Sequence, residues 1–168
     1  MKLINAAFAI AALICGTTAW AVTPVRVPLE SFQVVGEEFT DCGDFKVLDD
    51  WGYEGEEITY FNEDGSINRI MYKLRFPGGI YYNSNQPSYW LSGNAEHATR
   101  WLYFKDGEPT TATAVNHSIF VTAPGYGVVF KTASRLEIDW VTGEITFQAG
   151  TDDYQAGNFD ALCAALRP

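Results

Sequence analysis

The residues that could carry acid–base or metal chemistry are two histidines and the carboxylates near them. Glu96 precedes His97 directly, and His117 follows later in the chain. Imidazole and carboxylate groups serve as general acids and bases and as zinc ligands. Neither histidine belongs to a His-x-x-x-His motif, which would hold two ligands on one element, so we expect no metal site and no cofactor. If the protein is an enzyme, these three residues are its candidate acid and base groups.

The sequence shows no clear set of residues for nucleophilic catalysis or for glycoside hydrolysis. The chain contains no Gly-x-Ser-x-Gly motif, and Ser118 would point to the opposite face of a strand from His117. Adjacent acids such as Asp49-Asp50 are typical of solvated turns, and no catalytic pair stands out among 21 Asp and Glu residues. The sequence therefore identifies no catalytic residue and favours a function without catalysis.

Aromatic residues are the more unusual feature, at 15% of the chain. Part of this content is expected in the core, since aromatic side chains favour strands. Neighbours on a strand point to opposite faces, however, so Tyr81-Tyr82 and Tyr89-Trp90 cannot be wholly buried. The loop between them carries amide side chains, which suits a planar or sugar-like ligand. We predict an aromatic ligand-binding mouth formed by Tyr82, Tyr89, Trp90 and Trp101.

The N-terminus has the order of a secretory signal peptide. Lys2 precedes an apolar stretch over residues 3–14, and the small-residue site Ala19-Trp20-Ala21 follows. We expect cleavage after Ala21, which leaves one domain over residues 22–168 in a secreted or periplasmic protein. No later apolar run is long enough to span a membrane.

Cys42 and Cys163 are the two cysteines that follow this segment. An exported protein oxidises such a pair, so we predict a disulfide, the alternative being two unpaired thiols. The bond would close a loop of about 120 residues, and the loss of unfolded-chain entropy would stabilise the fold by about 4 to 5 kcal/mol.

The net charge of −10 excludes one class of partner. An acidic surface repels nucleic acid and anionic membranes, so a small molecule is the partner we expect. The composition does not indicate an oligomeric state.

Short strands and turn residues position these groups. Asp64-Gly65, Asp106-Gly107 and Thr142-Gly143 each separate two strand-like runs and predict hairpins. Over residues 68–76, Ile70, Tyr72, Leu74 and Phe76 alternate with charged residues, which predicts a half-buried strand. Further strands are expected at 32–40, 44–49, 79–83, 89–92 and 126–132.

This pattern predicts an all-β fold: an antiparallel meander barrel of about 8 to 10 strands, lipocalin-like in architecture only, with a two-sheet sandwich as the alternative. The last element differs. Phe159, Leu162, Cys163 and Leu166 have helical spacing, so one short C-terminal helix should dock on the barrel and attach to the Cys42 segment.

Several segments together resemble a loose group of secreted bacterial β proteins. The residues that carry the resemblance are Phe39-x-x-Cys42-x-x-Phe45, 61–65, 123–127, 142–150 and Phe159-Asp160-Ala161-Leu162-Cys163-Ala164-Ala165-Leu166. The resemblance covers most of residues 22–168 and implies export, a β fold and the cysteine pair. It implies no catalytic residue.

Three functions follow from these observations. The first is a secreted barrel that binds a small, partly apolar or sugar-like molecule at its aromatic mouth. The second is a structural or interaction domain of the cell envelope without a small ligand, and the third is an enzyme of unknown class. A large internal cavity would favour the first function, and a filled interior the second.

Overall fold

The chain folds into one antiparallel β sheet with two short helices. The structure, a computed structural model, describes residues 22–116 and 119–168, so the expected signal peptide and His117 lie outside the described residues. The strands are β1 (Val25–Asp41), β2 (Lys46–Phe61), β3 (Ile67–Phe76), β4 (Ile80–Asn83), β5 (Gln86–Ser92), β6 (Glu96–Lys105), β7 (Glu108–Asn116), β8 (Ile119–Ala123), β9 (Gly127–Asp139) and β10 (Ile145–Asp152); the helices are α1 (Asp153–Ala156) and α2 (Asp160–Ala165). The predicted all-β class, strand number and C-terminal helix are confirmed.

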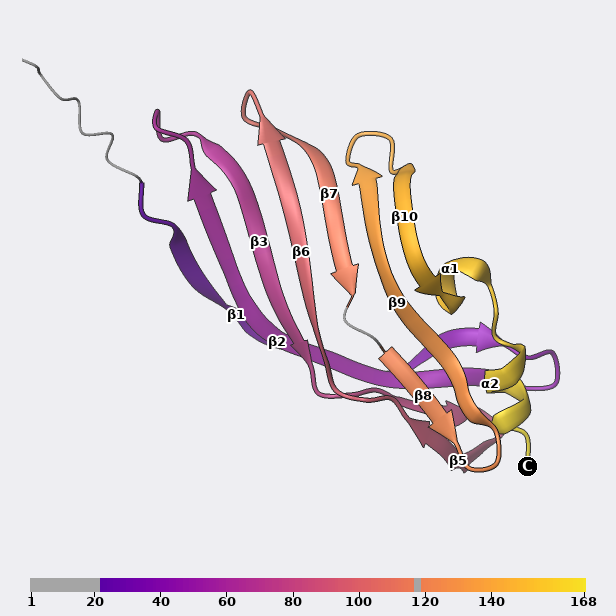
Figure 1. Ribbon diagram of the computed structural model, residues 1–168. Helices are drawn as coiled ribbons and strands as arrows, with labels where there is room; N and C mark the ends of the chain where they lie inside the picture. The colour runs from indigo at the N-terminus through magenta and orange to yellow at the C-terminus, as the bar shows by residue number, and fades with distance from the viewer. Residues whose placement is uncertain (1–21, 117–118) are drawn as a thin grey trace, which may run out of the picture.

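The strands are antiparallel, and the neighbours in the sheet are mostly close in the sequence, as in β1 and β2, β2 and β3, β6 and β7, and β9 and β10 (Figure 1). β3 and β4 pair with the same strand, β2, one after the other. β7 and β8 likewise pair in turn with β9. Between them, β6 pairs with β3 and β7, while β5 pairs with β4. One bridge, between Gly93 and Val121, joins the end of β5 to β8. In each of the pairs β3 and β4, β5 and β6, and β7 and β8, the second strand therefore continues the place of the first in the sheet after a break.

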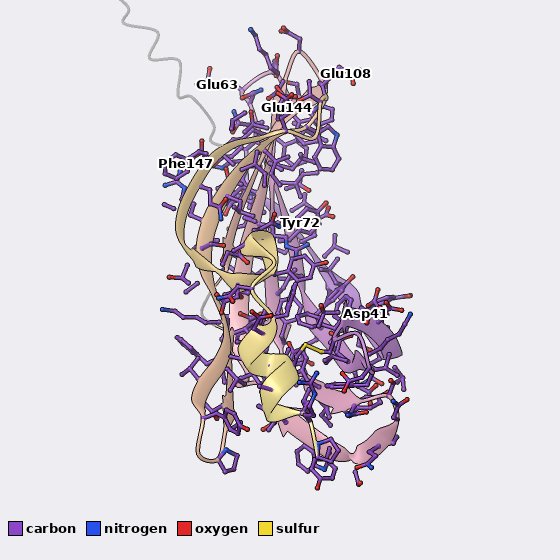
Figure 2. All side chains as sticks on the ribbon, turned by 90° about the vertical axis from the view of Figure 1, so that its right-hand side faces the viewer. Asp41, Glu63, Tyr72, Glu108, Glu144 and Phe147 are labelled. Carbon is purple, nitrogen blue, oxygen red and sulfur yellow. A yellow bond between two sulfur atoms is a disulfide. The ribbon has the colours of Figure 1, made fainter. Side chains whose placement is uncertain are left out.

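The three predicted hairpins are confirmed. They join β2 to β3, β6 to β7 and β9 to β10. Asp106 and Gly107 have φ of 54° and 84°, the left-handed backbone that a two-residue hairpin turn requires and that this residue pair tolerates best. Figure 2 shows Glu63, Glu108 and Glu144, one from each hairpin, gathered at one end of the sheet.

The predicted closure of the sheet into a barrel is wrong, because the sheet is open. β1 and β10 are edge strands, and each pairs on one side only within the described residues. β1 carries three register irregularities that twist it along β2. After β10 the chain turns into α1 and α2 instead of returning to β1, so no strand completes the ring.

The core lies at the end of the sheet where the helices dock (Figure 1). Leu162 and Leu166, on the predicted apolar stripe of α2, are 0% and 1% exposed. The Cys42–Cys163 disulfide is present, with a Cα–Cα distance of 5.7 Å, and it ties the end of β1 to α2. The helix and the disulfide thus hold together the two ends of the open sheet. The buried residues packed around α2 are Phe45, Val47, Tyr81, Val121, Ala123, Val129 and Phe130.

The alternation predicted for β3 defines two faces of the sheet. Leu74 is buried, while Lys73 and Arg75 are exposed on the opposite side, as expected. We call the face of Tyr72 and Leu74 the inner face, because register pairing continues it through β2 and β4 to the core residues near α2. Figure 2 shows Tyr72 on this side of the sheet and Phe147, from β10, on the other.

Candidate functional site

The inner face carries three adjoining cavities. Their volumes are about 420, 400 and 460 Å³. Of the described residues, Arg100 on β6 is the one that lines all three. A cavity of about 420 Å³ also lies beside β1 and β2, but neither Asp49 nor Glu96, the buried carboxylates considered next, lines it. The inner face is therefore the candidate site.

The first cavity combines acidic and aromatic side chains, and we call it the acidic cavity. Arg100 is the cation among its lining residues, and Ile119 is the aliphatic residue. Four carboxylates and five aromatic rings provide the rest of the lining: Glu37, Glu38, Asp49 and Glu96, with Phe39, Trp51, Phe76, Tyr81 and Tyr154.

Asp49 and Glu96 are the buried acids of this cavity. They are 6% and 7% exposed, and each has one carboxylate oxygen that is buried and accepts no hydrogen bond. Burial raises the pKa of Glu96 to about 7, although the charge of Arg100 opposes the shift. Burial also raises the pKa of Asp49 to about 6, and the negative charges of Glu37 and Asp50 add to this shift.

Tyr81 lies close to both acids and is placed by strand pairing and by glycines. It is the register partner of Asp49 across β2 and β4. Burial raises the pKa of Tyr81, and the charges of Asp49 and Glu96 raise it further. A Cβ atom added at Gly93 would lie 3.3 Å from the Tyr81 ring, so the absence of a side chain there lets the ring pack closely against the backbone.

The other two cavities are mostly apolar. We call the cavity of about 400 Å³ the upper cavity and the cavity of about 460 Å³ the central cavity. Ala112 and Trp140 line both. Leu74 and Leu102 add aliphatic surface to the upper cavity, and Leu136 does so in the central one. Arg100 is exposed, so water can hydrate its guanidinium where these apolar walls meet the acidic cavity.

The four residues of the predicted aromatic mouth do not form one cluster. Tyr82 and Trp90 are register partners on β4 and β5, and Tyr89 is their neighbour; Tyr89 and Trp90 are 44% and 57% exposed. Trp101 lies far along the sheet from them, stacked on Tyr103. Trp101 borders the upper cavity, whereas the other three line none of the cavities on the inner face.

The candidate acid–base groups are also separated. Glu96 lies on the inner face, whereas His97, the next residue of β6, is exposed and pairs with Arg75 of the outer face. Within residues 22–116 and 119–168, no three His, Cys, Asp or Glu side chains are grouped so that they could hold a metal ion. In the same part of the chain, no helix is long and apolar enough to cross a membrane.

Sequence reasoning missed Asp49 as a candidate, because an Asp-Asp pair reads as a solvated turn. The signal that could have found it is the position of Asp49 two residues after Val47, on the same face of one strand, since Val47 is fully buried. Comparison of the chain with protein-family models, curated proteins and solved structures found no match.

Proposed function

We propose that this protein is an exported binding protein that holds a small, partly apolar molecule on the inner face of its sheet. The observation that carries the proposal is the set of three adjoining cavities of about 400 to 460 Å³ that meet at Arg100. Ligand pockets of this size are typically lined by apolar side chains with a few polar groups that orient the ligand. The upper and central cavities supply the first kind of surface, and the acidic cavity supplies the second.

Export is supported by the disulfide, because such bonds persist in oxidising compartments outside the cytoplasm. The N-terminal order of charged, apolar and small residues supports it independently. N-terminal sequencing of the exported protein tests this part of the proposal. It should find Val22 as the first residue, and an intact Met1 would refute the expected cleavage.

Binding can be measured by the fluorescence of Trp51 and Trp140, which line the cavities. A panel of eight-carbon compounds with different polar groups should include one that changes this fluorescence saturably. Ala112→Phe should fill space in the upper and central cavities and weaken binding at least tenfold. Thr99→Phe is the matched control, because Thr99 precedes Arg100 on β6 and its side chain points to the outer face.

Trp90→Ala separates the inner face from the aromatic mouth expected from the sequence. If the inner face binds the ligand, this variant should keep the affinity of the unmodified protein. If Trp90→Ala loses binding and Ala112→Phe keeps it, the ligand binds at β5 and not on the inner face. A panel without any saturable response would refute binding of this class of molecule.

A further inference from the structure

We infer that the acidic cavity accepts an organic cation, the protonated primary amine of an amphipathic molecule whose apolar chain extends into the upper and central cavities. This inference rests on the proposed binding function and specifies its ligand class. It concerns the polar end of the ligand, since the apolar cavities by themselves accept any hydrocarbon chain.

The two buried acids of the cavity have unmet hydrogen bonding. Asp49 Oδ1 and Glu96 Oε2 are buried and accept no hydrogen bond. A buried acceptor without a donor costs free energy, so these positions favour a ligand that brings N–H groups. The terminal torsions of Asp and Glu are soft, which lets the carboxylates turn toward a donor in the cavity they line. An ammonium group has three donors and no acceptor.

The other two acids of the cavity already have partners. Glu37 Oε2 accepts a hydrogen bond of 2.7 Å from the Trp51 indole N–H. Glu38 forms an ion pair with Lys46. A ligand cation is therefore directed to Asp49 and Glu96 rather than shared among four carboxylates.

The aromatic lining favours the same charge. The faces of aromatic rings attract cations electrostatically, and this attraction grows where water is excluded. Phe39 packs edge-on against Tyr81 with ring centroids 5.0 Å apart, and it also contacts Tyr154 at 5.7 Å. These rings line the acidic cavity together with Trp51 and Phe76. Such a surface suits an ammonium group better than a carboxylate.

Arg100 is the group that opposes a cation. Arg100 is an exposed residue, so water can satisfy its guanidinium, and it does not need an anionic ligand to complete its hydrogen bonds. It lies where the three cavities meet. An anionic ligand would be attracted by Arg100 but repelled by the carboxylates of the same cavity. Because the carboxylates outnumber this one cation, the cavity favours a cationic ligand.

The pH dependence of binding follows from the groups around the cavity. These are Glu37 and Glu38 from β1, Asp49 from β2, Tyr81 from β4, Glu96 and Arg100 from β6, and Tyr154 from α1. Asp49 and Glu96 take up protons as the pH falls from 8 to 5, because burial raises the pKa of each. An alkylamine stays protonated over this range, as lysine does. Its affinity should therefore fall at least tenfold between pH 8 and pH 5.

Calorimetric titration of the exported protein with octylammonium, octanoate and octanol tests the inference. Octylammonium should bind at least tenfold more tightly than the other two. Glu96→Gln and Asp49→Asn should each weaken octylammonium binding about tenfold and affect octanol binding much less, because octanol carries no charge. Glu54→Gln is the control, because it removes an exposed carboxylate of β2 that pairs with Arg75 on the outer face. Arg100→Gln should strengthen octylammonium binding.

The possible failures are distinguishable. Tighter binding of octanoate, lost in Arg100→Gln, would overturn the cation and leave the binding function in place. Equal binding of the three compounds would also overturn the cation and leave the binding function in place, and it would mean that only the apolar chain is recognised. Binding of none of them, together with no saturable fluorescence response to the wider panel of eight-carbon compounds, would remove the binding function itself. Unfolding curves of each variant establish that it is folded, and Asp49→Asn tests the inference independently of Glu96→Gln.

Discussion

Replacing the carboxylate of Glu96 by an amide should stabilise the protein in alkaline solution but not in acid. Glu96→Gln keeps the size and shape of the side chain and removes its charge. The side chain is 7% exposed at the start of β6, and burial raises its pKa to about 7 from an ordinary value of 4.5. The folded state therefore holds this proton more tightly than the unfolded chain does.

The magnitude follows from linkage between protonation and folding. Below pH 4.5 the carboxyl is protonated in both states and contributes nothing that depends on pH. Between pH 4.5 and about 7 the unfolded chain loses the proton first, so the stability of the unmodified protein falls as the pH rises. The difference of about 2.5 pKa units corresponds to about 3 kcal/mol. Above pH 7 the loss is complete, and Glu96→Gln avoids it.

Urea unfolding at several pH values from 4 to 8.5, followed by tryptophan fluorescence, measures this effect. The difference in unfolding free energy between Glu96→Gln and the unmodified protein should increase by about 3 kcal/mol across the range. Any cost of the amide that does not depend on pH cancels from this increase. Glu63→Gln, in an exposed turn, should differ from the unmodified protein by less than about 0.5 kcal/mol. A difference for Glu96→Gln that stays constant with pH would refute the raised pKa of a buried carboxyl at this position.

Three further predictions use the same unfolding measurement. Asp49→Asn should also become more stable relative to the unmodified protein as the pH rises, but over a lower pH range, between about 3.8 and about 6. A gain confined to higher pH would contradict the raised pKa of Asp49. Leu74→Ala should lose about 2 to 5 kcal/mol because it opens a cavity in a buried site, whereas Lys73→Ala should change stability by less than about 0.5 kcal/mol; equal losses would mean that the faces of β3 are misassigned. The double variant Cys42→Ser and Cys163→Ser should lose up to about 4 to 5 kcal/mol, and an unchanged midpoint would show that the bond does not constrain the unfolded chain.

The strands and their turns could be predicted because local residue patterns decide them. Asp106-Gly107 tolerates the left-handed backbone of a tight turn, and the alternation around Leu74 separates the two faces of a strand. The bounds were less accurate where a strand continues through polar residues. β1 extends over Val25–Asp41, well beyond the expected 32–40, and β2 (Lys46–Phe61) joins the expected strand 44–49 to the run that precedes the Asp64-Gly65 turn, because pairing with each other satisfies the backbones of both strands.

The candidate site could not be predicted to the same degree. Alternation places Tyr82 and Trp101 on one face or the other of a strand, but it does not say which face of the sheet forms the cavity. It also does not say that Tyr82 and Trp101 lie far apart along the sheet. Register pairing decides both, and it brings Asp49 beside Tyr81 instead.

The sequence by itself determined the β class, the hairpins, the terminal helix and the disulfide of this protein, because each depends on neighbouring residues or on the only cysteine pair outside the expected signal peptide. The tertiary structure alone decided that the sheet stays open, with α2 and the Cys42–Cys163 bond holding its ends together. It alone also turned Asp49 and Glu96 into buried acids with raised pKa values. The physical reason is that a pKa depends on burial and on nearby charges, and these are set by strands that are distant in sequence and adjacent only in the folded sheet.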